Sequence, residues 1–214
     1  ICAAFALFNG DLIAGGIIIS AGATVVANIA RWDGSTWHAM GQGLPTALYS
    51  EGVRTLCVYD NALIAGGGFT TSAGAPGGYI ARWDGSTWSA LDGVLNGAVF
   101  ALAAYNGELV VGGGFTAAGS VAADYIARWS GTAWSQLPGI AGSDGVSPGF
   151  VWSLVVHDGE LMVGGNFSSA GGVPAGLIAA WNGGGWRALG NGEAVGTEVS
   201  TMTVYNGDLI VGGD

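Results

Sequence analysis

Short apolar runs alternate with tight-turn sequences along the whole chain. Residues 99–105, VFALAAY, form a run that is typical of a β-strand, and Asn106-Gly107 follows it. This dipeptide predicts a two-residue hairpin turn, because both central positions of such a turn prefer a positive φ. A second strand is predicted over 108–115, ELVVGGGF, with glycine where another backbone comes close. No segment shows a sustained helical period.

The same unit continues with a loop and a second hairpin. The loop is predicted over 116–124, TAAGSVAAD, and the third strand over 125–129, YIARW. Ser130-Gly131 then predicts another tight turn, with Asp-Gly at the same place in the first two units, and TAWSQL is the fourth strand. One unit is therefore expected to form a sheet of four antiparallel strands.

The unit is repeated four times with fixed internal spacing. The peptide IARWDGSTW stands at 29–37 and again at 80–88. Fixed spacing marks packed structure, and variable spacing marks an exposed connection. In every unit 29 residues separate the aromatic or histidine side chain before the first turn from the second tryptophan, whereas 17 to 23 residues lead from there to the next unit. The constant pairs are Phe8–Trp37, Tyr59–Trp88, Tyr105–Trp134 and His157–Trp186.

Four short antiparallel strands in units of this length predict the blades of a β-propeller in an all-β chain. A linear β-solenoid is the second choice. We expect a single propeller segment over 1–214, with four complete units and half of a fifth. Because the fifth unit stops after its second strand, we expect either that the segment belongs to a longer chain or that another copy completes it by strand exchange. The units are expected at about 1–52, 53–98, 99–150, 151–198 and, for the partial one, 199–214.

The glycine pairs and aromatic residues of the repeat resemble those of kelch-type blades. Gly-Gly ends the second strand, an aromatic residue opens the third, and a tryptophan closes the unit. An aromatic-hydroxyl pair after the glycines, then AG and IARWDGSTW, is closer still to repeats of secreted bacterial propellers and of a fungal cell-polarity surface family. These pairs are Phe69-Thr70, Phe115-Thr116 and Phe167-Ser168.

The resemblance implies a fold more than an activity. Kelch-like folds include the galactose-oxidase central domain, whose copper chemistry needs histidines and tyrosines on particular loops. This chain has only His38 and His157, at non-equivalent positions of the repeat. The resemblance therefore does not imply oxidase activity here.

Charge and cysteine content limit the choice of partner and compartment. The chain has no lysine, five arginines and fifteen acidic residues, giving a net charge of −10, so it lacks the cationic surface that nucleic acid requires. No apolar run reaches the roughly 18 residues of a membrane span. Cys2 and Cys57 fall at different positions of equivalent strands, so buried free thiols are expected rather than a disulfide. The scarcity of long charged side chains favours an extracellular or cell-surface location.

The sequence contains no constellation that predicts catalysis or metal binding. It lacks GxSxG and any zinc-ligand spacing, and its glycine pairs end strands instead of preceding a helix. Calcium or a glycosidase mechanism would need acidic side chains that converge, and no such group stands out. We expect no enzyme activity, no cofactor and no metal. The acids weighed for calcium lie singly in or beside turns: Asp11, Asp33, Asp60, Asp84, Glu108, Asp158, Glu160 and Asp208.

One position of the first strand changes its residue type from unit to unit. It is expected on the face that carries the variable connections, at the mouth of the propeller channel. Large, dissimilar side chains there would form a binding patch, although filling of differently shaped gaps between blades is the simpler explanation. Arg54, Phe100 and Trp152 are the candidate binding residues, with Ala3 and Ser200 in the same register.

Other repeated polar residues are expected to be structural or solvated. Arg31, Arg82 and Arg128 precede the first tryptophan of each pair, and Ala180 replaces them in the fourth unit. A cation–π or hydrogen-bond role within the blade explains this pattern most simply. His38 and Arg187 follow the second tryptophan and are expected at an outer, solvent-exposed position.

The sequence thus predicts a non-enzymatic extracellular module that binds a protein or builds a surface or filament structure. A propeller lectin is the alternative, because aromatic side chains repeated once per blade are typical of sugar pockets. The fixed spacing of the tryptophans favours core packing instead. The expected partner is a protein or glycan at the cell surface, with self-assembly through the incomplete fifth unit as a further prediction.

Overall fold

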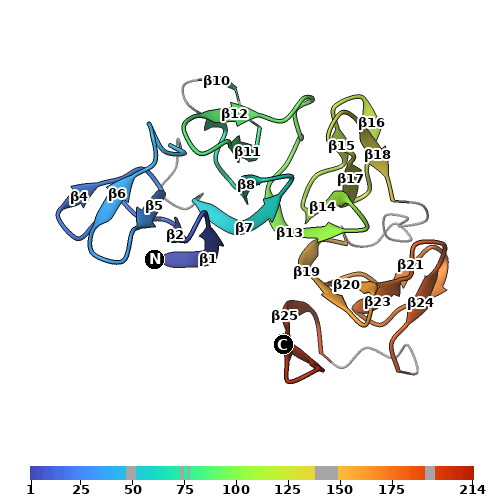
Figure 1. Cartoon of the computed structure of the whole chain (residues 1–214). Coiled ribbons are helices and arrows are strands. Elements are labelled where there is room, and N and C mark those ends of the chain that lie inside the picture. Colours follow the sequence, from blue (N-terminus) through green and yellow to red (C-terminus); the bar gives the residue numbers. More distant parts are fainter. Residues whose placement is uncertain (47–51, 73–74, 77, 138–148, 191–195) are drawn as a thin grey trace. The chain divides into compact units, whose positions relative to one another are not determined.

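The computed structural model describes residues 1–46, 52–72, 75–76, 78–137, 149–190 and 196–214. In these ranges every regular element is a β-strand, as the sequence predicts, and none is a helix (Figure 1). No helix in the described part of the chain could therefore cross a membrane. The strands form repeated four-stranded antiparallel sheets of the propeller-blade type, followed by a two-stranded fifth repeat.

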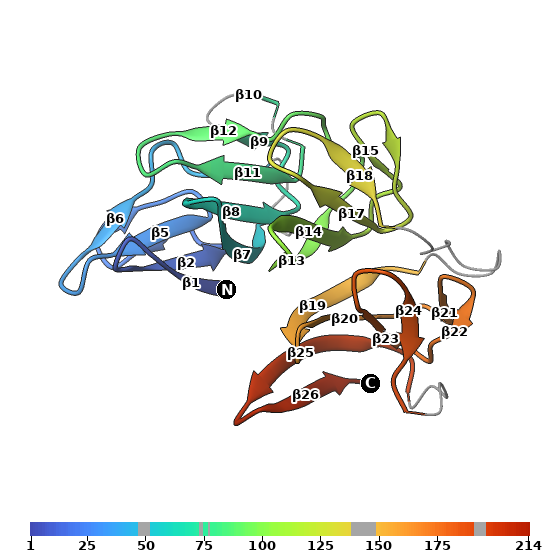
Figure 2. The same ribbon diagram turned by 45° about the vertical axis from the view of Figure 1, so that its right-hand side comes forward.

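Each complete blade has its four long strands in chain order across the sheet (Figures 1 and 2). The first blade consists of β1 (Cys2–Phe8), β2 (Asp11–Gly16), β5 (Ile29–Trp32) and β6 (Trp37–Ala39). The second consists of β7 (Val53–Tyr59), β8 (Ala62–Gly67), β11 (Ile80–Trp83) and β12 (Trp88–Ala90). The third consists of β13 (Val99–Tyr105), β14 (Glu108–Gly113), β17 (Ile126–Trp129) and β18 (Trp134–Gln136).

The fourth blade and the partial fifth blade follow the same plan. The fourth consists of β19 (Val151–His157), β20 (Glu160–Gly165), β23 (Ile178–Trp181) and β24 (Trp186–Ala188). The fifth has only β25 (Val199–Tyr205) and β26 (Asp208–Gly213), which form a hairpin (Figure 2). By contacts, the chain divides into two compact units, Ile1–Val99 and Phe100–Asp214. A single propeller segment over 1–214 stays a prediction.

The loop expected between the second and third strands contains a small hairpin. In the third blade, β15 and β16 pair inside the segment that the sequence assigns to a loop. Two residues per strand give too short a run to show period-2 alternation, so the sequence gave no strand signal here. The four hairpins are β3 (Ser20–Ala21) with β4 (Thr24–Val25), β9 (Thr71–Ser72) with β10 (Ala75–Pro76), β15 (Ala117–Ala118) with β16 (Val121–Ala122), and β21 (Ser169–Ala170) with β22 (Val173–Pro174).

The first turn of each blade has the predicted two-residue geometry. Phe8 pairs with Asp11, and the two residues between them, Asn9 and Gly10, have φ of 52° and 89°. Two positive φ values are what a type I′ turn requires. The same turn joins the first two strands of the other blades.

The second turn is longer than the Asp-Gly dipeptide predicts. Trp32 pairs directly with Trp37, so four residues separate the strands and the fourth strand begins at the tryptophan. The carboxylate of Asp33 explains the difference, because its Oδ1 accepts hydrogen bonds from the backbone N–H groups of Ser35 and Thr36, both at 2.8 Å. Binding two backbone donors at once holds the chain in a wider turn.

The Gly-Gly pair at the end of the second strand serves two kinds of contact. A Cβ atom on the first glycine, Gly15, would lie 2.5 Å from Cγ1 of Val53, which starts the next blade. A Cβ on the second, Gly16, would collide with the backbone carbonyl oxygen of Ile1 in the same blade. The predicted close backbone approach is therefore found at the second glycine, and the first admits a valine from the following blade.

This valine contact recurs at every junction between repeats. Around it lie the core clusters, in which side chains of adjacent blades pack together. One cluster of the first unit joins Ile13 and Ile29 of the first blade to Leu63 and Ala81 of the second. The four glycine–valine pairs are Gly15–Val53, Gly66–Val99, Gly112–Val151 and Gly164–Val199.

Both cysteines are free thiols, as expected, but they are not buried. Cys2 is solvent-exposed and Cys57 is half-buried. Cys2 stands in the register of Val53, and no blade precedes β1 in this chain to cover it. The expectation of buried thiols was wrong because it treated the first blade as an interior one.

Candidate functional site

The variable position of the first strand is a β-bulge. In β7 the pairing with β8 skips one residue between Val53 and Thr55, and in β19 the pairing with β20 skips one between Val151 and Ser153. A bulged residue stays out of the hydrogen-bond ladder, so its side chain is aimed independently of the strand pattern. The skipped residues are Ala3, Arg54, Trp152 and Ser200, and Phe100 has the equivalent place in β13.

Two of the three candidate residues come together in the second unit. The rings of Phe100 and Trp152 are stacked, with centroids 4.4 Å apart and an interplanar angle of 18°. Arg54 belongs to the first unit, where its side chain is exposed to solvent. The sequence thus identified a pair of residues that touch, in neighbouring blades of one unit.

Two further aromatic side chains complete the cluster, and the sequence analysis missed both. Phe150 makes edge-on contacts with Phe100 at 6.1 Å and with Trp152 at 5.5 Å between ring centroids. Tyr125 meets Phe150 at 5.8 Å, with the two rings nearly perpendicular. Phe150 lies directly before β19 and Tyr125 directly before β17, outside the repeated strand pattern. The aromatic cluster is defined here as Phe100, Tyr125, Phe150 and Trp152.

Backbone contacts fix Phe150 within this cluster. Its N–H donates to Oδ1 of Asn166 at 2.7 Å, and its carbonyl oxygen accepts from the N–H of Asn166 at 3.3 Å. A Cβ atom on Gly114 would lie 3.3 Å from Phe150 and 3.4 Å from Phe100. The glycine that follows β14 therefore leaves the space in which the two phenyl rings lie.

Tyr125 is held by an unusual backbone conformation that recurs in each complete blade. Its φ is 68°, a left-handed value that is uncommon for a bulky residue. In this conformation its carbonyl oxygen accepts from Gly113 N–H and its own N–H donates to Phe115, both at 3.0 Å. The same conformation with different side chains in every complete blade indicates a structural role for the backbone. The equivalent residues are Asn28, Tyr79 and Leu177.

Trp152 carries a polar atom that the described residues do not satisfy. Its Nε1 is buried and has no hydrogen-bond partner among them. A buried donor that lacks an acceptor costs about 1–3 kcal/mol. A ligand that placed an oxygen at this atom would recover that cost.

The tryptophan pairs of the repeat are packed inside the blades. Trp83 and Trp88 are partners across β11 and β12, with ring centroids 5.2 Å apart, and both are buried. Trp88 Nε1–H donates to the carbonyl oxygen of Met40 in the first blade at 2.9 Å. This packing agrees with the expectation that the tryptophans belong to the core.

The repeated arginine forms an ion pair across each of two blades. Arg31 lies 2.5 Å from a carboxylate oxygen of Asp11, and Arg128 lies 3.0 Å from one of Glu108. These contacts support the hydrogen-bond interpretation of the repeated arginine. The fourth blade has Ala180 at this place, and Arg187, its partner across β23 and β24, instead donates to Glu160.

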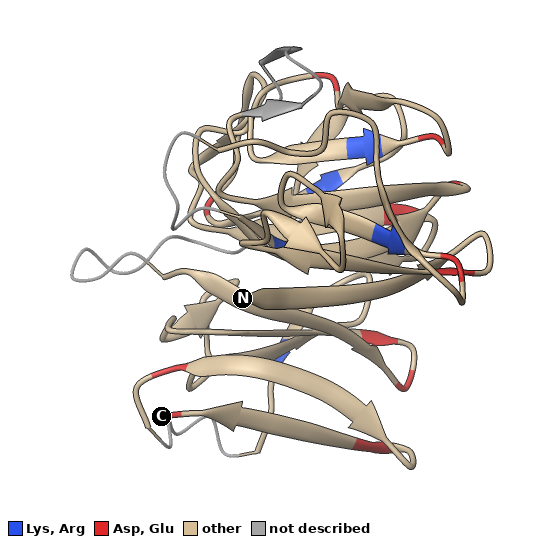
Figure 3. Cartoon of the chain, turned by 90° about the vertical axis from the view of Figure 1, so that its left-hand side faces the viewer, with Lys and Arg blue, Asp and Glu red and all other residues tan. Residues whose placement is uncertain are grey.

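Other acidic side chains are engaged in turns, mostly at the ends of strands (Figure 3). Hydrogen bonds from Thr36 N–H, and then from His38, hold the pKa of the Asp33 carboxyl well below its usual range. The backbone N–H groups of Thr87 and Ser86 do the same for Asp84. Among the described residues, no three His, Cys, Asp or Glu side chains are grouped so that they could hold a metal ion. His38 is 41% exposed, in agreement with the outer position expected for it.

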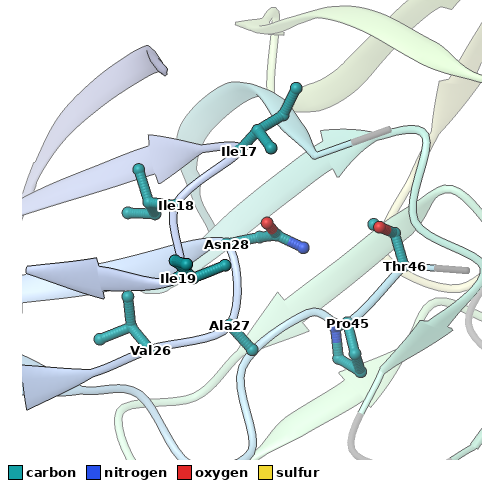
Figure 4. A pocket seen from close by; sticks show the side chains of 8 residues that line it. All are labelled: Ile17, Ile18, Ile19, Val26, Ala27, Asn28, Pro45 and Thr46. Atoms are coloured by element: carbon teal, nitrogen blue, oxygen red, sulfur yellow. The ribbon is translucent and has the colours of Figure 1, made fainter. Parts of the chain in front are cut away.

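The first unit contains two hollows outside the aromatic cluster. One, of about 280 Å³, lies beside the β3–β4 hairpin, where Ile17, Ile18, Ile19 and Val26 line it with Asn28 (Figure 4). The Asn28 amide donates to the Leu44 carbonyl oxygen at 2.8 Å, so its hydrogen-bonding capacity is partly used. The other, of about 350 Å³, lies near the Arg31–Asp11 ion pair and the edge of Trp83.

Comparison with known proteins gives the fold and no family. No protein-family model matches the chain, and no curated protein matches it. The computationally designed Ika8 protein is 17% identical, with a TM-score of 0.50 over 98% of this chain and 67% of that one. The designed Ika4 protein is 18% identical, with a TM-score of 0.46 over 85% of this chain and 90% of that one.

A natural protein also has a similar fold. The extracellular domain of a hybrid two component system from B. thetaiotaomicron is 9% identical, with a TM-score of 0.57 over 98% of this chain. The match covers 25% of that domain, so this chain corresponds to about a quarter of its length. At these identities the similarity concerns the fold alone.

Proposed function

We infer that the chain is a non-enzymatic, kelch-type propeller module that binds an extracellular protein through the aromatic cluster. The observation that carries this inference is the stacked pair Phe100–Trp152 at the bulge position, with the buried Nε1 of Trp152 lacking an acceptor. Tryptophan and tyrosine are enriched at the energetic centres of protein interfaces. A backbone carbonyl of an extended partner segment would supply the missing acceptor.

The use of the charged residues supports a binding role over a catalytic one. Asp11, Glu108 and Glu160 pair with arginines, and Asp33 and Asp84 hold turns together. Carboxylates employed in this way are not poised for acid–base chemistry, which needs pKa values near the working pH. An extracellular or cell-surface location is part of the proposal, and a secretion signal in the full reading frame would test it.

A protein partner is favoured over a glycan by the packing of the aromatic rings. Sugar binding uses the open face of an aromatic ring, but Trp83, Trp88, Trp129, Trp134 and Trp181 are all less than 10% exposed. In the aromatic cluster, Phe100 covers one face of Trp152 and Phe150 meets it at the edge. The cluster presents an irregular apolar surface with one N–H donor, which suits a peptide segment.

The test is a binding screen with purified extracellular protein domains and, in parallel, a glycan array. Trp152→Phe removes the N–H group and keeps an aromatic ring, so a protein ligand should bind at least tenfold more weakly to this variant. Trp37→Phe, in a tryptophan pair of the other unit, is the matched control and should bind normally. Retention of glycans at several equivalent sites, or protein binding that is insensitive to Trp152, would contradict the proposal.

A further inference from the structure

The junctions between repeats share one contact, formed by two side chains and one glycine. Over Gly15 lie Cγ1 of Val53 and Cδ1 of Leu56, which would be 2.5 and 3.4 Å from a Cβ atom there. Gly164 receives Val199 and Met202 in the same manner, at 2.5 and 3.1 Å. In a regular strand, residues i and i+3 face opposite sides. The bulge adds one residue between them and brings both to the same face.

The first blade carries the two side chains of this contact with no glycine opposite them. Cys2 and Phe5 stand in the register of Val53 and Leu56. Phe5 is 62% exposed, whereas Leu102 and Met202, at the same register in later blades, are each 8% exposed. The face of β1 is thus an unused half of the junction.

The fifth repeat carries the other half of the contact. A Cβ atom on Gly212 would meet only Cγ2 of Thr201, within the same hairpin, at 3.2 Å. Ile210, two residues earlier, is 48% exposed. Its counterparts in the four complete blades face the next repeat and are almost fully buried: Ile13, Ile64, Val110 and Met162.

We propose that two copies of this chain associate head to tail, with Cys2 and Phe5 of one copy packing on Gly212 and Ile210 of the other. The argument is continuity, because the chain forms this contact at each of its four internal junctions. The two unused halves are complementary and different, so the association is heterologous and can continue from copy to copy. It uses the faces of the sheets and is independent of ligand binding at the aromatic cluster.

A disulfide cross-link tests the register of this association. In the internal junctions the facing atoms come close enough that a cysteine at 212 would meet the native thiol of Cys2. We expect Gly212→Cys, in a Cys57→Ser background, to form disulfide-linked dimers and longer chains under mild oxidation. Because only the methyl of Thr201 lies near Gly212, this variant should fold.

Two controls separate the proposed contact from random collision. Adding Cys2→Ser should abolish the cross-link, and Asp208→Cys, four residues earlier on β26, should give at least tenfold less of it. Absence of cross-linked chains would overturn the proposal. A disulfide within a single chain would also overturn it, because the two faces would then meet in one molecule.

Sedimentation velocity gives a second measurement without engineered thiols. The average mass of the unmodified chain should rise with concentration. Phe5→Asp should raise the apparent Kd at least tenfold, because it places a charge in the apolar contact. Val25→Asp, at a side chain that is 82% exposed in β4, should leave the association unchanged. A chain that stays monomeric at all concentrations would refute the association.

Discussion

Cγ1 of Val53 lies where a side chain on Gly15 would begin, and this relationship joins the first blade to the second. Packing of this kind cannot be adjusted by rotating a flexible side chain, since valine has one strongly preferred rotamer in most backbones. The missing Cβ of one residue and the branched Cβ of another are therefore parts of the same contact.

Gly15→Ala should destabilise the chain by about 1–3 kcal/mol, the usual cost of overpacking a well-packed core. Gly212→Ala is the matched control, because it stands at the same position of a repeat whose next neighbour is absent. Its effect on the free energy of unfolding, measured by urea denaturation, should be clearly smaller. Equal effects of the two substitutions would show that the Val53 contact is not the cause.

Trp88→Phe should cost about 1 kcal/mol beyond the small change in packing. The substitution removes the indole N–H that donates to the Met40 carbonyl oxygen, and the net value of such a bond is about 0.5–1.5 kcal/mol. Trp37→Phe makes the same chemical change in a half-buried tryptophan of the first blade. Thermal unfolding should distinguish the two variants, and a larger loss for Trp37→Phe would contradict this explanation.

Asp84→Asn should lower stability at neutral pH and lose that effect in acid. Hydrogen bonds from Thr87 and Ser86 lower the pKa of Asp84 in the folded state, so its stabilising effect is complete above the ordinary aspartate pKa of about 4. It declines as the pH falls through that value towards the lower folded pKa. Asparagine occupies the equivalent place in the fourth blade, where Asn182 accepts from Gly184 and Gly185.

The measurement is the difference in Tm between Asp84→Asn and the unmodified chain from pH 7 to pH 3. The difference isolates this carboxyl, because all other titrating groups are common to both proteins. It should shrink steadily towards the acid end. A difference that stays constant with pH would exclude a contribution from the charge of Asp84.

Arg187→Ala should weaken the fourth blade slightly, and Ala180→Arg in the same protein should restore what is lost. The reason is that Arg187 replaces, from the neighbouring strand, the arginine that pairs with an acid in the first and third blades. The pair is exposed to solvent, so the effect should be small and should disappear at high salt. Chemical denaturation at low and high salt would measure it.

Failure of the double variant to recover would mean that the position on β23 cannot support the pair in this blade. Arg187→Lys is a useful companion, because it keeps the charge but loses the fork of N–H donors. A salt-insensitive loss in Arg187→Ala would indicate a packing effect of the side-chain stem instead.

Repetition made most of the fold predictable from the sequence. Four copies of the same spacing identified the strands, the type I′ turns and the blades, because each copy confirmed the others. Elements shorter than the hydrophobic period escaped notice, such as the two-residue strands β15 and β16. The length of the second turn also escaped, because it depends on how the Asp33 carboxylate binds two backbone N–H groups.

The candidate site was predictable only where it departs from the repeat. Phe100 and Trp152 drew attention because their register contains dissimilar residues, and the bulge explains why dissimilar residues fit there. Phe150 and Tyr125 gave no such signal. Their contacts depend on Gly114 and on a left-handed backbone at Tyr125, which only the three-dimensional arrangement reveals.

The irregularity in each first strand has a consequence for how such a protein can change. A side chain that stands outside the ladder can be replaced without shifting the pairing of the residues around it, as alanine, arginine, tryptophan and serine at this place already demonstrate. Every repeat therefore offers one position where new chemistry can be tried at little risk to folding, and recognition can diversify while the framework stays the same.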